Sequence, residues 1–127
     1  MKKLITTFTL LLMFSSPSYA EWKRVGKTTN GDSFYVDVDR IRKVDGFVYW
    51  WQLQDLPKPD SEGDFSYKSY SQGDCKLFRF KVLSYSYHTQ PMAKGNPSYS
   101  NNKPNEEWRY PSPNTSYETI LNKVCKR

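Results

Sequence analysis

Residues 47–56, FVYWWQLQDL, form the most apolar stretch after the amino-terminal segment and have the length of a β-strand. The Asp45-Gly46 pair before them predicts a turn, and Pro57 and Pro59 end the stretch because proline cannot donate a ladder hydrogen bond. Aromatic residues make up 17% of the chain, and such rings pack well on the pleated surface of a sheet. The stretch therefore predicts a strand whose aromatic side chains fill a sheet-based core.

Two strands are predicted upstream of this stretch, at residues 22–27 and 33–38. The pair Asn30-Gly31 between them tolerates the positive φ angles of a tight hairpin. In the second strand apolar and polar residues alternate, so we expect one of its faces to be buried. The segment 39–43 is too short for a full helix, and we expect a single turn capped by Asp39.

Two further strands are predicted downstream, at residues 65–71 and 74–87, with Gln72-Gly73 separating them. In the later strand apolar and basic residues alternate from Phe78 to Val82, so one face should be core and the other wet. Pro, Asn, Ser, Gly and Lys dominate residues 88–113, where only residues 107–110 resemble a strand.

The chain ends in a predicted helix. Residues 115–118, Thr-Ser-Tyr-Glu, fit a capping box, in which a hydroxyl and a carboxylate bond the free N–H groups of the first turn. The apolar residues that follow share one helical face because they are spaced i, i+3, i+4 and i+7: Tyr117, Ile120, Leu121 and Val124. Cys125 falls in the last turn of this helix.

The amino terminus has the three parts of a secretory signal peptide. Lys2 and Lys3 precede an apolar run over residues 4–14, and residues 18–20 supply the small residues that a signal peptidase recognises. The run falls short of the roughly 18 apolar residues that a membrane span needs. We predict a cleaved signal peptide at 1–20, a single domain at 21–127 with no transmembrane segment, and a periplasmic or extracellular location.

Cys75 and Cys125 are the chain's two cysteines, and an exported chain meets oxidising conditions. We therefore expect one disulfide, which would tie the terminal helix to the strand containing Cys75. The two cysteines are not a C-x-x-C pair, and with His88 as the single histidine they cannot complete a four-ligand zinc site. We expect no metal and no cofactor.

The net charge does not indicate a nucleic-acid partner. Without Lys2 and Lys3, 17 Lys and Arg residues remain against 13 Asp and Glu, so the formal charge falls from +6 to +4. The remaining cations are scattered along the sequence, whereas nucleic-acid binders gather them to neutralise phosphates. We expect no nucleic-acid partner and retain attraction to acidic proteins or other anionic surfaces.

The chain lacks the combinations of residues that common catalytic sites need. A Ser-His-Asp or Cys-His arrangement needs a histidine, and His88 follows an exposed-looking Tyr-Ser-Tyr sequence, so we expect a surface imidazole rather than a catalytic base. One alternative stays open, a small periplasmic hydrolase with paired carboxylates. Its candidate acids are Glu106 or Glu107 with Asp64 or Asp74.

The sequence offers a candidate binding surface instead. Residues 84–110 mix Tyr, Ser, Asn and Gly, a composition typical of adaptable binding loops because tyrosine offers large amphipathic area at low entropic cost. A basic cluster in the segment 39–43 could recognise an acidic partner. The candidate residues are Arg40, Arg42, Lys43, Tyr85, Tyr87, Tyr99 and Trp108.

The order and spacing of several residues resemble the surface-adhesin protein E family. The matching positions are Trp22, Tyr35-Val36-Asp37, Ile41-Arg42, Val48 to Trp51, Ser69, Asp74-Cys75, Trp108, Pro111 and Val124-Cys125. The resemblance implies an α+β fold, an antiparallel sheet of about six strands with a C-terminal helix tethered by the disulfide. The characterised members of that family are surface adhesins that bind extracellular-matrix and serum proteins and can dimerise, and the resemblance implies the same properties for this chain. Those adhesins are lipoproteins, whereas no cysteine follows the predicted cleavage site here.

We therefore predict an exported, non-enzymatic binding module that contacts a host matrix protein or a protein of its own envelope. The alternatives are the carboxylate hydrolase and a structural component of the envelope.

Overall fold

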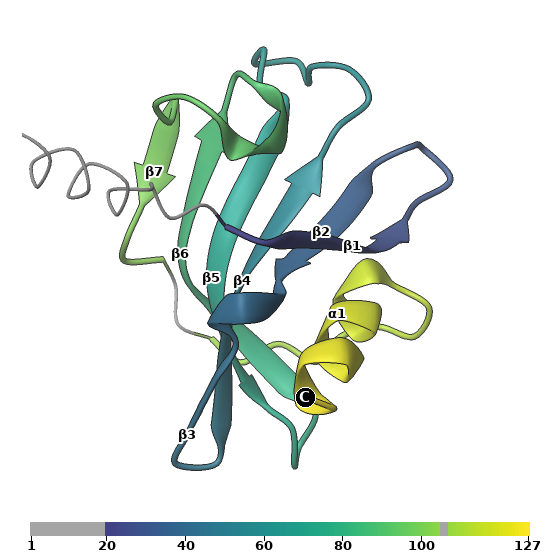
Figure 1. The fold of residues 1–127 in the computed structure, drawn as a ribbon, viewed down its shortest axis with the longest axis vertical. Coiled ribbons are helices and arrows are strands. Elements are labelled where there is room, and N and C mark those ends of the chain that lie inside the picture. The colour runs from purple at the N-terminus through teal and green to yellow at the C-terminus, as the bar shows by residue number, and fades with distance from the viewer. Residues whose placement is uncertain (1–19, 105–106) are drawn as a thin grey trace, which may run out of the picture.

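The computed structural model describes residues 20–104 and 107–127 (Figure 1). The predicted signal peptide therefore lies outside the described residues, except for Ala20. No helix among the described residues is long and apolar enough to cross a membrane.

Within the described part of the chain, seven strands form one antiparallel sheet, and one α-helix packs against it. The strands are β1 (Trp22–Lys27), β2 (Ser33–Asp37), β3 (Arg42–Val44), β4 (Phe47–Asp55), β5 (Ser66–Asp74), β6 (Arg79–His88) and β7 (Tyr99–Asn101), and the helix is α1 (Ser116–Cys125). The order across the sheet is β1-β2-β4-β5-β6-β7, and β3 also pairs with β4. This architecture confirms the predicted fold class.

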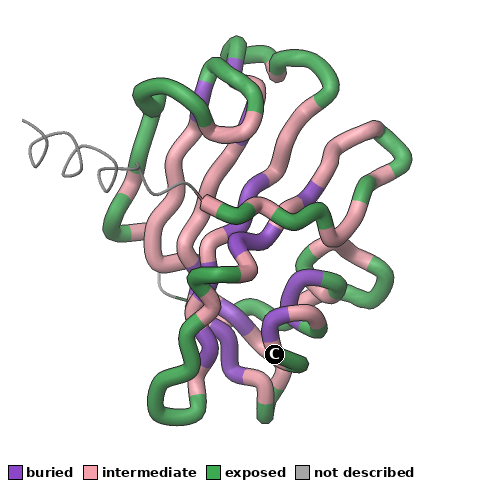
Figure 2. The backbone as a smooth tube through the Cα atoms, viewed as in Figure 1, coloured by how far each residue is buried: buried purple, intermediate pink, exposed green. Residues whose placement is uncertain are grey.

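The core lies between α1 and one face of the sheet. Cross-strand register aligns Val48 with Gly73 and Phe80, so these three residues face the helix together. The buried apolar cluster contains Phe34, Val36, Val48, Trp50, Phe80, Ile120, Leu121 and Val124. Buried segments gather where α1 meets the strands, whereas the far halves of β5 and β6 are mostly half-buried (Figure 2).

The turn between the last two long strands lies at residues 75–78, so the predicted turn at Gln72-Gly73 is wrong. Gly73 pairs with Val48 and Phe80 inside β5, and a side chain at this position would collide with its neighbours. A Cβ atom at this position would lie 2.8 Å from Cζ3 of Trp50 and 3.0 Å from Cδ1 of Leu121. A glycine inside a strand can mark such a close approach as well as a turn.

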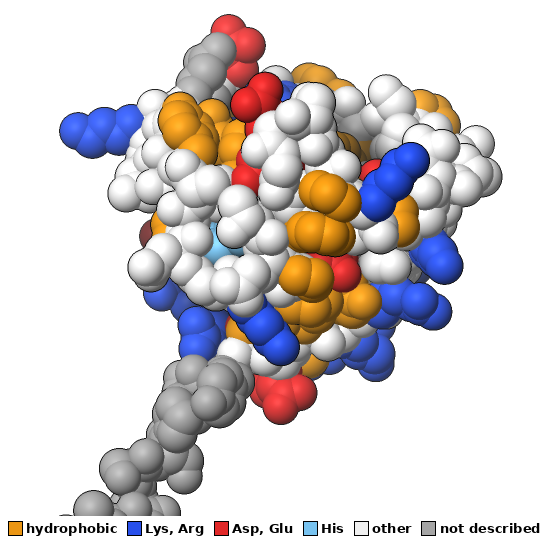
Figure 3. Space-filling model, turned by 90° about the horizontal axis from the view of Figure 1, so that it is seen from above, with side chains coloured by type: hydrophobic (Ala, Val, Ile, Leu, Met, Phe, Trp, Pro, Cys, Tyr) orange, Lys and Arg blue, Asp and Glu red, His pale blue; other side chains and the backbone are white. Residues whose placement is uncertain are grey.

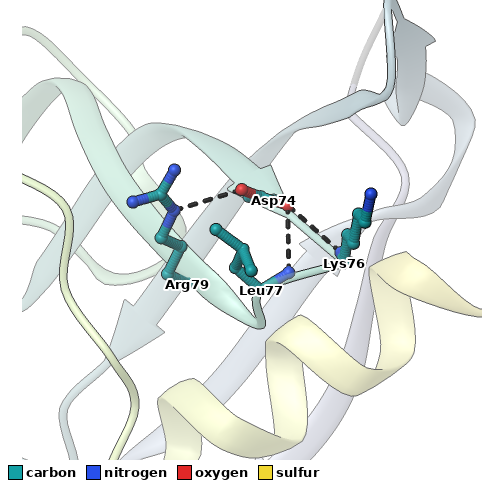
Figure 4. Close-up of polar contacts among 4 residues, drawn as sticks. All are labelled: Asp74, Lys76, Leu77 and Arg79. Carbon is teal, nitrogen blue, oxygen red and sulfur yellow. Dashed lines mark hydrogen bonds and ion pairs between the residues drawn. The ribbon is translucent and has the colours of Figure 1, made fainter.

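Asp74 organises the true turn (Figure 4). Its Oδ1 accepts hydrogen bonds of 3.1 Å from the backbone N–H groups of Lys76 and Leu77, and its Oδ2 pairs with Arg79 Nε at 3.1 Å. The hydrogen bond from Leu77, with the Arg79 guanidinium adding to it, lowers the pKa of Asp74. The carboxylate thus replaces backbone partners that the reversing chain cannot supply.

Three other local predictions need correction. The 3-10 turn at Val38–Arg40 is capped by Asp37, whose Oδ1 accepts from the N–H of Asp39, so Asp39 is not the cap. Arg42 and Lys43, predicted within that turn, belong instead to β3. In the predicted strand 107–110 only Arg109 makes a bridge, with Phe80, while β7 was not predicted.

The terminal helix and the disulfide are confirmed. Thr115 caps α1 by accepting from the N–H of Glu118, and the helix buries Ile120, Leu121 and Val124. Burial of each of these side chains contributes roughly 1.5–3 kcal/mol. Cys75 and Cys125 form the disulfide with a Cα–Cα distance of 5.7 Å. The bond ties the last turn of α1 to the β5–β6 turn rather than to a strand.

Candidate functional site

The helix covers only one end of its face of the sheet, and the uncovered end forms a groove of about 520 Å³. We call it the tyrosine groove. Its strand residues are Gln52 and Gln54 of β4, Tyr67 and Ser69 of β5, and Val82, Tyr85 and Tyr87 of β6. Asp60, Glu62 and Asp64 from the β4–β5 loop form part of its wall, and Arg109 and Tyr117 also line it.

Strand pairing places the groove residues in rows. Gln54, Tyr67 and Tyr87 are aligned across β4, β5 and β6, and Gln52, Ser69 and Tyr85 form the neighbouring row. Residues in register on adjacent strands lie about 5 Å apart and point to the same side of the sheet. The amides and phenols therefore share one surface although the sequence separates them.

Tyrosine rings contact one another along the groove and at its edge. The ring centroids of Tyr67 and Tyr87 lie 5.1 Å apart, and those of Tyr85 and Tyr87 lie 5.5 Å apart. Tyr99 of β7 extends the cluster, 5.6 Å from Tyr87 and 6.0 Å from Tyr85. Burial raises the pKa of Tyr87 and of Tyr67, so both phenols are neutral at physiological pH.

Hydrogen bonds within the protein fix several groove side chains. The Tyr67 hydroxyl donates to Asp60 Oδ2, and this bond is the main cause of the lowered pKa of Asp60. Asp60 Oδ1 also accepts from the N–H groups of Glu62 and Asp64, both at 2.9 Å. Asp64 is buried and accepts from the Ser98 hydroxyl at 2.6 Å.

The opposite face of the sheet has different chemistry, and residues 91–93 cover only the end of it that contains Leu53 and Ser66. We call this face of the sheet the basic–aromatic face. Its members alternate with the groove and core residues along the same strands: Arg42, Phe47, Tyr49, Trp51, Lys68, Tyr70, Arg79, Lys81 and Trp108. All of them are exposed or half-buried. In this set four cations accompany five aromatic rings, and the Asp74 carboxylate, in register with Phe47 and Arg79, lies on the same face and pairs with Arg79.

Cations lie over aromatic rings throughout this face. Arg79 and Lys81 lie 4.3 and 4.7 Å from the ring centroid of Trp108, which also stacks on Phe47 at 5.9 Å. Further along the strands, Lys68 lies 5.2 Å from the centroid of Trp51. Such contacts are attractive because the ring face carries partial negative charge, and they hold the cations in place.

The structure divides the predicted binding residues among three places. Tyr85, Tyr87 and Tyr99 form the tyrosine cluster, whereas Trp108 and Arg42 lie on the basic–aromatic face, where Arg42 is 5.9 Å from the centroid of Tyr49. The other two predicted cations make contacts within the protein: Arg40 Nε lies 3.5 Å from Asp37 Oδ2, and Lys43 donates to the carbonyl oxygen of Arg127.

Several residues of both surfaces were not predicted. The tyrosine groove adds Gln52, Gln54 and Tyr67, and the basic–aromatic face adds Arg79 and Lys81. Alternation along residues 79–82 gave a signal for the two cations, because it put them on the wet face. For the groove residues the sequence held no comparable signal, because strand register brings them together.

The groove does not gather the candidate catalytic acids. Asp64 lines it, whereas Asp74 and the exposed Glu107 are not among its lining residues, and Glu106 lies outside the described residues. His88 is buried rather than a surface imidazole: it is 3% exposed, burial lowers its pKa, and its Nε2 lies 2.9 Å from the Ser86 hydroxyl. Among the described residues, no three His, Cys, Asp or Glu side chains are grouped to hold a metal.

Comparisons with known proteins agree with this architecture. A family model described as Surface-adhesin protein E matches residues 22–126. Crystal form II of Haemophilus influenzae protein E matches with a TM-score of 0.60 and 13% identity, over 87% of this chain and 91% of that chain. Protein E from non-typeable Haemophilus influenzae matches with the same score and identity, over 87% and 79% of the two chains. No match was found among curated protein sequences.

Proposed function

Because the chain belongs to the surface-adhesin protein E family, we propose that it is an exported, non-enzymatic module that binds another protein. The basic–aromatic face supports this proposal best. We propose that this face binds an acidic surface of an extracellular-matrix protein or an envelope protein. Trp, Tyr and Arg are the residues that dominate the energetics of protein interfaces, and this face presents all three.

The chemistry of the face defines the partner. Arg42, Lys68, Arg79 and Lys81 give it a positive potential, which accelerates encounter with acidic partners and disfavours basic ones. Arg79 already pairs with Asp74, so the cations available to a partner are chiefly Arg42, Lys68 and Lys81. The rings beneath them supply apolar contact area once water is displaced.

The groove acids do not support the hydrolase alternative. A general acid in glycoside hydrolysis needs a raised pKa, whereas the pKa of Asp60 is lowered by its bond from Tyr67. Asp60 Oδ1 accepts from two backbone N–H groups as well. These bonds hold the carboxylate ionised, which suits a structural role in the loop.

A binding assay with charge-reversed variants tests the proposal. We expect Lys68→Glu combined with Lys81→Glu to weaken binding to immobilised matrix and serum proteins at least tenfold, and raised salt to weaken binding of the unaltered protein. The control is Lys58→Glu combined with Lys126→Glu, which makes the same charge change at exposed positions outside the face. Equal losses in both double variants would show a net-charge effect and contradict an assignment to this face.

Two further measurements test the remaining parts of the proposal. Fractionation of cells producing a tagged chain should recover it outside the cytoplasm, and recovery purely from the periplasm would favour an envelope partner over a host partner. Dimerisation, which the family resemblance implies, stays a prediction that light scattering would test.

A further inference from the structure

We propose that the tyrosine groove is a binding site for a short oligosaccharide that carries no carboxylate or sulfate groups. This site lies on the face of the sheet opposite to the basic–aromatic face, so it is a second and independent binding function. Its volume of about 520 Å³ is within the range of small-ligand pockets, roughly 300–1,000 Å³.

The first argument is the aromatic platform. The ring centroids of Tyr85 and Tyr87 lie 5.5 Å apart with the planes tilted by 35°, and Tyr67 meets Tyr87 edge-on at 5.1 Å and 61°, so the three tyrosines together present apolar ring surface and hydroxyl groups. Aromatic residues of this kind combine a large apolar body with a polar tip. A sugar ring has the matching character, with apolar C–H groups on its face and hydroxyls around its edge.

The second argument is a buried polar side chain that retains an unused donor. Gln52 is 6% exposed, and its Oε1 is fixed by a 2.8 Å hydrogen bond from the Trp50 indole N–H. Its amide nitrogen has no hydrogen-bond partner among the described residues, and the side chain lines the groove. That nitrogen is not among the fully buried polar atoms that lack a partner, so it keeps access to the groove and can donate to a ligand acceptor such as a sugar hydroxyl.

Gln54, two residues further along β4, supplies the complementary group. Its Nε2 donates to Asp32 Oδ2 at 3.1 Å, which fixes the amide and leaves its Oε1 to accept from a ligand. The Ser69 hydroxyl lies in the next row and can both donate and accept. Fixed donors and acceptors that alternate over a few ångströms suit a ligand whose hydroxyl groups do both.

The charge around the groove determines which sugars fit. Asp60, Glu62 and Asp64 lie on its wall, opposed by Arg109. Lys68 also borders the groove, but its ammonium group lies over Trp51 on the other face of the sheet. A ligand with carboxylate or sulfate groups would meet net negative charge, so neutral and amino sugars are favoured.

Two of the wall carboxylates already accept hydrogen bonds within the protein, which argues against a basic peptide as the ligand. Asp60 accepts from Tyr67 and from two backbone N–H groups, and Asp64 accepts from Ser98. A guanidinium needs a carboxylate with free oxygen positions for paired hydrogen bonds, and these two acids have used several of theirs. Recognition therefore relies on the tyrosines and amides, which favours a sugar.

Titration of the ¹⁵N-labelled chain, with its disulfide intact, tests the proposal directly. The probes are maltotriose, chitotriose, the glucosamine trimer, trigalacturonate and tri-arginine. We expect at least one neutral or amino trisaccharide to shift the Gln52 side-chain amide and the backbone N–H groups of Tyr85 and Tyr87, with at least tenfold weaker binding of trigalacturonate. The proposal is overturned by an absence of shifts at about 10 mM saccharide, by equal binding of trigalacturonate, or by tri-arginine binding more tightly than every sugar.

Two variants check the location without removing a core residue. Ser69 lies between Gln52 and Tyr85, so Ser69→Phe should fill the groove, and Tyr85→Ala should remove part of the platform. Each should weaken saccharide binding at least tenfold, whereas Tyr110→Ala, at a 66% exposed tyrosine outside the lining, should not. Unchanged binding by a folded Ser69→Phe chain would overturn the assignment. Lys81→Glu alone, at a position on the basic–aromatic face and outside the groove lining, should leave saccharide binding intact, which separates this test from that of the proposed function.

Discussion

Gly73→Ala is expected to destabilise the protein, although alanine is normally better tolerated than glycine inside a strand. A Cβ atom at this position would lie 2.8 Å from the Trp50 ring and 3.0 Å from both Leu121 and Val48. All three neighbours belong to the closed core between α1 and the sheet, so none can move without disturbing the others. Added volume in a packed core costs about 1–3 kcal/mol. We therefore expect a loss of about 2 kcal/mol.

The assay is denaturant unfolding of the disulfide-bonded chain, with the melting temperature as a second measure. A loss of about 2 kcal/mol corresponds to a fall of roughly 8–16 °C for a domain of this size. The matched control is Gly26→Ala in β1, where an added Cβ atom meets nothing within 4 Å. That change should be neutral or slightly stabilising, because it reduces the freedom of the unfolded chain.

Gly73→Ala also distinguishes the two placements of this residue. If Gly73 lay in a solvent-exposed turn, an added methyl group would meet water and the stability would change little. Stability within about 0.5 kcal/mol of the unaltered protein would therefore refute the placement of Gly73 against Trp50. Leu121→Ala removes one of the colliding atoms, so the double variant with Gly73→Ala should lose less stability than the sum of the two single losses.

Three other predictions concern the turn, the helix and the disulfide. Replacing both Cys75 and Cys125 by serine should lower the free energy of unfolding by about 4 kcal/mol, the chain-entropy value for a loop of 50 residues, as measured by denaturant unfolding. Asp74→Asn should flatten the acid side of the stability profile. The pKa of Asp74 is lowered by folding from its ordinary 3.8, so its contribution is present above that pH and is lost as the pH falls further, which unfolding titrations between about pH 5 and pH 2 would detect. Thr115→Ala removes the cap of α1 and should cost about 1 kcal/mol, whereas Thr115→Ser, which keeps a hydroxyl, should cost less.

Local patterns in the sequence predicted most of the fold. The bounds of β1 were predicted to the residue, and β4 ends one residue earlier than predicted, because period-two alternation and turn residues act over a few positions. The terminal helix and its capping by Thr115 followed from equally local signals. The disulfide was predictable because two cysteines allow only one pairing.

The prediction errors occur where the local structure depends on a contact with residues that are distant in the sequence. Gly73 is a glycine because Trp50 and Leu121 approach it, and neither is near it in the sequence. Strand β7 is three residues long and exists because residues 99–101 pair with residues 85–87 of β6. Neither contact leaves a periodic trace, so composition alone favoured a turn at the first site and a loop at the second.

The candidate sites show the same division. Tyr85 and Tyr87 could be predicted to share a face, because alternate residues of one strand point the same way. Gln52 and Tyr67 join them only through the pairing of β4 with β5 and of β5 with β6. Trp108, which the sequence grouped with the tyrosines, packs on the other face against Phe47 and Arg79. One predicted surface is therefore two surfaces of different chemistry.

The length of the helix explains why this sheet has a groove at all. At about 1.5 Å per residue the ten residues of α1 span about 15 Å, whereas the ten residues of β6 span about 33 Å. The disulfide fixes the last turn of α1 at the β5–β6 turn, so the helix seals the apolar residues at that end. From the opposite end, orange hydrophobic and red acidic side chains are visible together, with most Lys and Arg side chains toward the edges (Figure 3). Large exposed apolar patches are uncommon in proteins, and the sequence places glutamine, serine and tyrosine on the uncovered half of the face, residue types that suit the proposed saccharide site.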